Sequence, residues 1–100
     1  MYSSLLQFIK QSLKDYGWHV DEDKFQDNTP EGKVTFANVI ATLDPKATRR
    51  LVLACHYDSK FYKDKEFLGA TDSAVPCAQM IDLARVMTPI LKSKCKVSTE

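Results

Sequence analysis

The chain carries an amphipathic, helix-like pattern near each end. Residues Tyr2–Tyr16 place an apolar stripe opposite polar side chains, and Gly17 follows directly, which predicts a first helix. Residues Val75–Met87 carry an apolar face wide enough to be largely buried, which predicts a second helix. Pro89 should stop or kink that helix, and Ile90–Glu100 is expected to restart as a short helix before its residues become polar.

Three segments between these helices favour strands. Trp18–Phe25 alternates weakly, and Lys33–Leu43 is richer in residues that favour strands. The stretch between them, Asp27–Gly32, contains a proline and a glycine and predicts a loop or hairpin turn. Leu51–Cys55 is continuously apolar, which is typical of a central strand buried on both faces. The charged segment Phe61–Leu68 is predicted to be a loop.

The predicted order is helix, strand, strand, strand, helix, which indicates an α/β protein with an incomplete sheet. A strand buried on both faces needs a neighbour on each side, and no later segment of the chain offers one. A chain of 100 residues forms one domain at most. We therefore expect residues 1–100 to be the N-terminal fragment of a single larger domain.

The composition excludes only a few classes of function. The chain is 44% hydrophobic and 27% charged, which is ordinary for a globular protein. Its 14 Lys and Arg balance 13 Asp and Glu, so we expect no nucleic-acid partner and no electrostatic binding to an anionic membrane. No apolar run approaches the roughly 18 residues that span a bilayer. Residues Met1–Lys10 lack the basic and apolar regions of a signal peptide, so the sequence gives no direct indication of compartment.

The three cysteines are Cys55, Cys77 and Cys95. The odd count leaves at least one thiol unpaired within the chain, and the spacing is neither that of a zinc finger nor a Cys-x-x-Cys motif. Taken singly, each cysteine is expected to behave as a small buried apolar residue.

Two short runs carry side chains that are suited to chemistry. His56 and Asp58 lie two residues apart at the end of the predicted central strand, which suits metal binding or a hydrogen-bonded His–Asp pair. Asp72 precedes the second helix, where it can hold a cation or cap the helix, because Asp is a preferred N-cap residue. Each residue has an ordinary structural explanation when it is considered alone, so the two runs have to be judged together.

Together, the runs LVLACHYDSK (Leu51–Lys60) and GATDSAVPCA (Gly69–Ala78) closely resemble the animal glutaminyl-peptide cyclotransferases, also called glutaminyl cyclases. The segment FANVIATLDP (Phe36–Pro45) resembles the strand and turn that precede them in the same family. The resemblance extends from about the first helix to Leu91 and is strongest over Leu51–Cys77.

The resemblance implies a fold, a reaction and a compartment. The family is related to the zinc aminopeptidases and has a three-layer α/β/α sandwich, of which this chain would be the N-terminal part. Its members are zinc-dependent acyltransferases that convert the N-terminal glutamine of peptides and proteins to pyroglutamate and release ammonia. Secretion, or residence in the lumen of the secretory pathway, is expected from the same resemblance.

The resemblance also implies roles for single residues. Asp72 matches the Asp ligand of the one zinc ion in animal glutaminyl cyclases. The Glu and His ligands and the acid/base carboxylates fall in later parts of the family's sequence, so no catalytic residue is expected in this chain. His56 and Asp58 resemble the remnant of a second metal position, and we expect them to act as structural or hydrogen-bonding residues behind the zinc ligand.

The family pattern further implies a disulfide between Cys55 and Cys77 and a cis peptide between Asp72 and Ser73. Cys95 has no place in that pattern.

Two alternatives stay open. A zinc aminopeptidase relative would need a second metal with His56 as a ligand, although the Val75–Cys77 sequence is the cyclase version of this stretch. A non-catalytic fragment or isoform is the other alternative. In either case the truncated chain alone is expected to be inactive.

Overall fold

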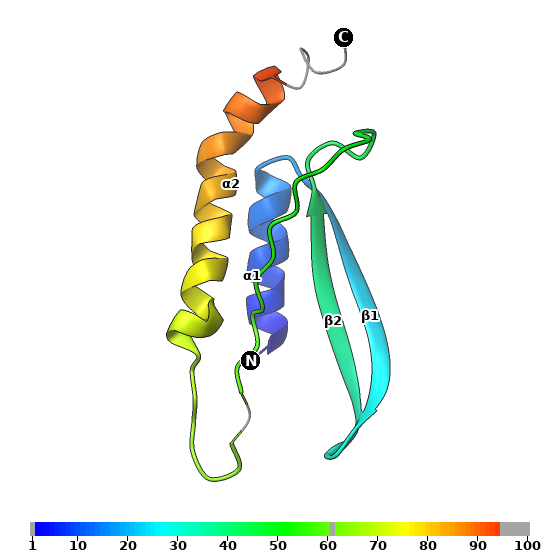
Figure 1. The fold of residues 1–100 in the computed structure, drawn as a ribbon, viewed down its shortest axis with the longest axis vertical. Coiled ribbons are helices and arrows are strands. Elements are labelled where there is room, and N and C mark those ends of the chain that lie inside the picture. Colours follow the sequence, from blue (N-terminus) through cyan, green and yellow to red (C-terminus); the bar gives the residue numbers. More distant parts are fainter. Residues whose placement is uncertain (1, 61, 95–100) are drawn as a thin grey trace. The chain divides into compact units, whose positions relative to one another are not determined.

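The computed structural model describes residues 2–60 and 62–94 of the chain. These residues divide into two compact units, an N-terminal unit (Met1–Ala47) and a C-terminal unit (Thr48–Glu100), which are described separately. In chain order the elements are α1 (Tyr2–Asp15), β1 (His19–Thr29), β2 (Gly32–Thr42), η1 (Ala70–Ala74) and α2 (Val75–Lys94) (Figure 1). The predicted incomplete α/β fold is confirmed. None of the described helices is both long enough and apolar enough to cross a membrane.

The N-terminal unit is a long antiparallel hairpin with a helix. The β1–β2 register runs from His19 opposite Thr42 to Thr29 opposite Gly32, so a two-residue turn joins the strands. The Thr29 hydroxyl donates to the Gly32 carbonyl across this turn at 2.7 Å, and Gly32 has a φ of 107°. The loop predicted over Asp27–Gly32 is therefore shorter than expected, because strand pairing continues to the turn itself.

The helix α1 contacts both strands of the hairpin. Residues that alternate along the strands on one face are half-buried, among them Val20, Val39 and Ala41. On that face Lys10 of α1 reaches Glu22 of β1 with 2.7 Å between Nζ and Oε2, and both side chains are less than one-fifth exposed. The N-terminal unit is thus held by a complete backbone ladder and by one inter-element ion pair.

The segment predicted as a buried central strand is extended but unpaired. Among the described residues the only sheet is the two-stranded β1–β2 hairpin, so Leu51–Cys55 has no strand partner. Leu51 is 89% exposed and Val52 is 78% exposed, so the prediction of a buried strand is wrong for this chain. The physical reason is that a strand exists only through its hydrogen-bonded neighbours, and the described residues supply none.

Of the two outcomes predicted for Pro89, a stop or a kink, the stop is wrong, because the helix α2 continues through this residue. A proline inside a helix removes one backbone hydrogen bond, but the neighbouring turns retain theirs, and the Thr88 hydroxyl donates to the Ala84 carbonyl. The restart predicted over Ile90–Glu100 is absorbed into α2 as far as Lys94, and residues 95–100 lie outside the described residues.

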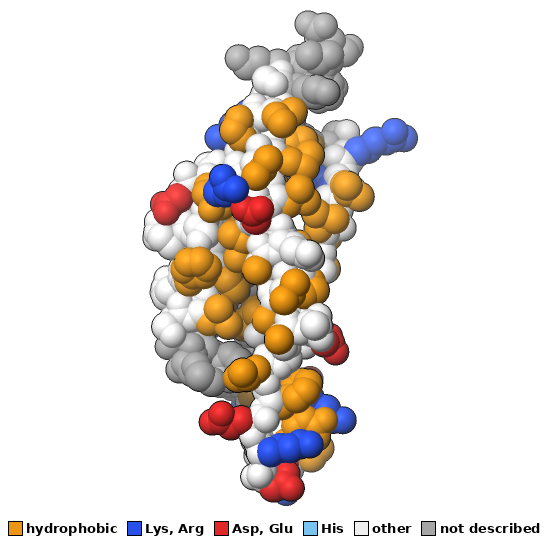
Figure 2. Space-filling view, turned by 90° about the vertical axis from the view of Figure 1, so that its left-hand side faces the viewer, with side chains coloured by type: hydrophobic (Ala, Val, Ile, Leu, Met, Phe, Trp, Pro, Cys, Tyr) orange, Lys and Arg blue, Asp and Glu red, His pale blue; other side chains and the backbone are white. Residues whose placement is uncertain are grey.

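The helix is also less covered than its apolar pattern predicted. Leu83, Val86 and Ile90 share a face at helical spacing and are each about half exposed. Figure 2 shows that hydrophobic side chains are exposed on the surface.

Candidate functional site

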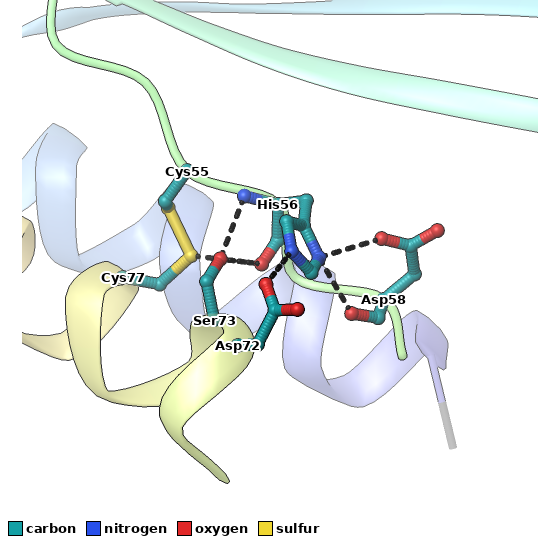
Figure 3. Close-up of a disulfide and its surroundings, with 6 residues drawn as sticks. All are labelled: Cys55, His56, Asp58, Asp72, Ser73 and Cys77. Carbon is teal, nitrogen blue, oxygen red and sulfur yellow. Dashed lines mark hydrogen bonds and ion pairs between the residues drawn. A yellow bond between two sulfur atoms is a disulfide. The ribbon is translucent and has the colours of Figure 1, made fainter. Parts of the chain in front are cut away.

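The candidate site forms where the extended segment around His56 meets the start of α2. A disulfide joins Cys55 to Cys77, with 5.5 Å between their Cα atoms, which is the pairing that the family resemblance implies (Figure 3). The bond brings a residue next to His56 against the first turn of the helix. The peptide bond between Asp72 and Ser73 is cis, which also agrees with the resemblance.

The backbone of His56 is held by the side chain of Ser73. The Ser73 hydroxyl donates to the His56 carbonyl at 2.7 Å and accepts from the His56 N–H at 3.0 Å. Ser73 is only 8% exposed, so both bonds lie in a protected position. The Cys77 sulfur lies 3.2 Å from the same carbonyl oxygen, but as a disulfide sulfur it has no proton to donate. The Ser73 hydroxyl thus satisfies both backbone hydrogen-bonding groups of His56, which no neighbouring strand among the described residues does.

The imidazole ring of His56 lies between two carboxylates. Its Nε2 is 2.6 Å from Oδ1 of Asp72, and its Nδ1 is 2.8 Å from the Asp58 carbonyl and 3.1 Å from Asp58 Oδ1 (Figure 3). The hydrogen bond to Asp72, followed by the bond to the Asp58 backbone, raises the pKa of His56. The ring therefore orients both acidic side chains.

Asp72 itself does not cap the helix. Its backbone angles are non-helical, φ −132° and ψ 84°, and its carboxylate turns to His56 rather than to the first N–H groups of α2. The side chain is 83% exposed. The structure therefore differs from the N-cap alternative that the sequence left open, and it presents Asp72 as an exposed, oriented carboxylate.

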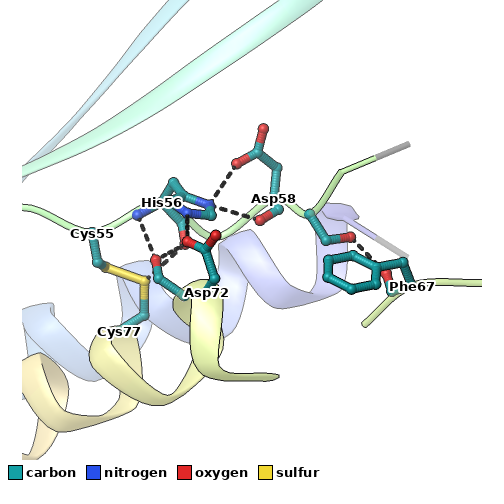
Figure 4. A network of polar contacts seen from close by, with 8 residues as sticks. Cys55, His56, Asp58, Phe67, Asp72 and Cys77 are labelled. Atoms are coloured by element: carbon teal, nitrogen blue, oxygen red, sulfur yellow. Dashed lines mark hydrogen bonds and ion pairs between the residues drawn. A yellow bond between two sulfur atoms is a disulfide. The ribbon is translucent and has the colours of Figure 1, made fainter. Parts of the chain in front are cut away.

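Gly69 lies close to the backbone of Asp72 and to the side chain of Ser59. A Cβ at this position would lie 2.7 Å from the Asp72 carbonyl oxygen and 3.0 Å from Ser59 Cβ, and its φ is 64°. Ser59 in turn donates from its hydroxyl to the Phe67 carbonyl at 2.8 Å (Figure 4). Only glycine permits this approach without displacing the neighbouring backbone.

Sequence reasoning assigned no role to Ser73 or Ser59. No pattern marks a serine whose hydroxyl bonds a backbone far along the chain, so these contacts had no signal in the sequence. His56, Asp58 and Asp72 were singled out, and the structure brings all three together.

The described residues do not form a complete metal centre. No group of three or more His, Cys, Asp or Glu side chains within residues 2–60 and 62–94 is arranged to hold a metal ion. Two ligands of one tetrahedral zinc are roughly 3.3–3.5 Å apart, given Zn–N and Zn–O distances of about 2.0–2.2 Å. The 2.6 Å between His56 Nε2 and Asp72 Oδ1 is a hydrogen-bond distance and is shorter than this separation, and a carboxylate such as that of Asp72 is a suitable zinc ligand.

Comparisons with known proteins show the family of the chain. A family model described as peptidase family M28 matches residues 38–98, more than half of the chain, and the chain belongs to this family. Its curated relatives are glutaminyl-peptide cyclotransferases. The protein of that name from Drosophila melanogaster is 52% identical over 98 residues, covering 93% of this chain and 28% of the relative. The protein from Gloydius blomhoffii is 56% identical over 85 residues, covering 79% of this chain and 23% of the relative.

Solved structures give the same result. The chain matches the crystal structure of Macrostomum lignano glutaminyl cyclase with a TM-score of 0.84 and 41% identity, covering 91% of this chain and 28% of that one. The resemblance to glutaminyl cyclases drawn from the sequence is confirmed. The chain spans about a quarter of the length of the curated relatives it matches.

Proposed function

We propose that this chain is part of a glutaminyl-peptide cyclotransferase, an acyltransferase that converts N-terminal glutamine to pyroglutamate and releases ammonia. The observation that carries the proposal is the exposed carboxylate of Asp72, which is oriented by His56 within a chain about half identical to proteins of that name. Peptides or proteins with N-terminal glutamine are the proposed substrates.

In this proposal Asp72 supplies one carboxylate ligand to a zinc ion. The ion, when bound, polarises the side-chain amide of the substrate glutamine as a Lewis acid. His56 fixes the direction of the Asp72 carboxylate by its 2.6 Å bond, and Asp58 holds the other side of the ring. Attack of the substrate α-amine on the amide and departure of ammonia need a carboxylate acid/base, which we expect outside this chain.

A substitution of Asp72 in the complete protein that contains this chain tests the proposal. Asp72→Asn should remove zinc, measured by elemental analysis, and abolish pyroglutamate formation. When both proteins are compared after removal of metal by a chelator, the thermal unfolding temperature should change little, because the side chain is exposed. Asp82→Asn is the matched control, since Asp82 is an exposed carboxylate on α2 that pairs with Arg85. Normal zinc content and activity in Asp72→Asn would contradict the ligand assignment.

A second candidate function is that of a zinc aminopeptidase, because the family model is that of a peptidase family. This function needs two metal ions with His56 as a ligand. Equal loss of metal from His56→Ala and Asp72→Asn, together with release of N-terminal residues from unblocked peptides, would favour it over cyclisation.

We also infer that the protein folds in an oxidising compartment of the secretory pathway or outside the cell. The Cys55–Cys77 bond supports this inference, because such bonds persist where thiols are not kept reduced. Peptide mapping of the protein purified from its native source, without reduction, should recover the two cysteines as one linked pair. Recovery of both as free thiols would contradict it.

A further inference from the structure

A closed loop stands next to the candidate site. It runs from Ser59 to Gly69, beginning directly after Asp58 and ending three residues before Asp72. The Ser59 hydroxyl donates to the Phe67 carbonyl at 2.8 Å (Figure 4). Gly69 lies so close to Ser59 that a Cβ on it would be 3.0 Å from Ser59 Cβ. Its two ends are therefore fixed to each other, as in a compact Ω-type loop. Residue 61 lies outside the described residues.

Two lysines of this loop gather on one aromatic ring. Lys65 Nζ lies 4.4 Å from the centroid of the Tyr62 ring, and Lys60 Nζ lies 5.3 Å from it. The Tyr62 ring is half-buried and meets the edge of Phe67, with 5.5 Å between centroids. The Tyr62 ring thus lies within cation–π distance of both ammonium groups. We call Lys60, Tyr62 and Lys65 the lysine–tyrosine cluster.

Neither lysine of the cluster forms an ion pair with a described carboxylate, although Asp64 and Glu66 belong to the same loop. A carboxylate of a ligand that approaches either ammonium group would be attracted to it. Each ammonium group offers several N–H donors to such a carboxylate.

We propose that the lysine–tyrosine cluster binds the side-chain carboxylate of an acidic residue in the peptide substrate, a few residues beyond the residue that reacts beside Asp72. This inference rests on the proposed function, since it takes the site around Asp72 as the place where a peptide terminus reacts. The loop is tied at its base to the segment that carries Asp58, which keeps the cluster and the site in one unit. The lysine–tyrosine cluster then determines which peptide sequences are preferred, and it does not change the reaction of the N-terminal residue of the substrate.

The test compares peptides in the complete protein. The peptides Gln-Ala-Glu-Phe-Ala and Gln-Ala-Gln-Phe-Ala differ only at the third residue, which carries a carboxylate in the first peptide and an amide in the second. A second pair of peptides has the same change at the second residue. The ratio of kcat/KM for the acidic over the neutral peptide should exceed one, and Lys65→Gln or Lys60→Gln should lower it by about two- to fivefold, the range of exposed ion pairs. Lys65→Glu should reverse the preference toward a peptide with lysine at that place. Raising the salt concentration should shrink the ratio, because exposed charges are screened.

Two controls separate specificity from loop stability. Lys33→Gln removes one positive charge from the hairpin of the other unit and should leave the ratio unchanged. Tyr62→Phe keeps the ring and should keep the ratio, whereas Tyr62→Leu removes the platform and should lower it. A ratio of one in the native protein, or lysine variants that slow all peptides equally, would overturn the inference.

A binding experiment distinguishes failure of this inference from failure of the proposed function. Product-like peptides that begin with pyroglutamate are titrated into the protein and followed by calorimetry. Tighter binding of the acidic peptide that depends on Lys60 and Lys65 supports the cluster even if no glutamine peptide is cyclised. Cyclisation of both peptides without any difference in binding supports the proposed function and overturns the inference.

Discussion

The two units of the chain are held by different kinds of interaction. The N-terminal unit has a continuous backbone ladder from His19 to Thr42 and a half-buried ion pair to its helix. The C-terminal unit has no sheet among its described residues, and its extended segment is fixed by a disulfide, by the Ser73 hydroxyl and by the His56 ring. Hydrogen bonds between paired strands thus support the N-terminal unit, whereas side-chain links attach the extended segment of the C-terminal unit to its helix.

This difference between the two units bears on where a functional site can form. The side-chain links of the C-terminal unit bring three chemically active side chains, His56, Asp58 and Asp72, together at one place. The same unit leaves Leu51 and Val52 open to solvent, so it is the part of the chain most dependent on further covering.

The largest expected effect concerns residues 1–100 expressed alone. The exposed apolar segment at Leu51–Leu53 and a two-stranded hairpin of marginal stability leave too little burial to offset a chain entropy of about 1–2 kcal/mol per residue. We expect the isolated chain to self-associate or to fold only in part, to bind no zinc tightly and to have no cyclase activity. Size-exclusion chromatography, a zinc assay and a Gln-peptide assay measure this.

If this chain proved to be a soluble monomer with cooperative unfolding, the expected dependence of the C-terminal unit on further covering would be wrong. Turnover of a Gln-peptide by the purified chain would show that the catalytic residues expected downstream are not required.

The next largest effect is expected from removal of the disulfide, which should destabilise one unit and not the other. Cys55 and Cys77 close a loop of sequence separation 22, so replacing both by serine should cost about 3 kcal/mol in the complete protein. Because the bond lies wholly in the C-terminal unit, hydrogen exchange should accelerate around His56 and the start of α2 and stay unchanged in the β1–β2 ladder. Cys95→Ser is the control and should leave exchange unchanged. Equal acceleration in both units would show that they unfold together.

The sequence predicted the parts of this fold whose causes are local. The periodicity of Tyr2–Tyr16 and the β-favouring residues of Lys33–Leu43 correspond to α1 and β2 with shifts of one residue at most. The strand predicted at Leu51–Cys55 failed because pairing depends on segments elsewhere, which a run of apolar residues does not report. The helix stop considered at Pro89 does not occur, because the hydrogen bonds of the neighbouring helical turns outweigh the one that proline removes.

The candidate site divides in the same way. Asp72 and His56 could be chosen from the two runs because their residue types suit metal and hydrogen-bond chemistry. The 2.6 Å distance between them and the two hydrogen bonds from the Ser73 hydroxyl to the His56 backbone join residues that are 16 and 17 positions apart in the chain. No spacing rule predicts such contacts, since they depend on how η1 turns toward the extended segment.

The smallest expected effect lies in the N-terminal unit and concerns the ion pair of Lys10 with Glu22. The hydrogen bond and charge of Lys10 lower the pKa of the Glu22 carboxyl, and Lys24 adds a weaker attraction at 3.6 Å. A carboxyl with a lowered folded-state pKa contributes stability that is complete above its unfolded value of about 4.3 and is lost as pH falls through the folded value. The free energy of unfolding of the complete protein should therefore fall less steeply with acid in Glu22→Gln than in the native sequence. Identical slopes in the native protein and Glu22→Gln would show that this pair adds nothing to the ladder that holds the unit.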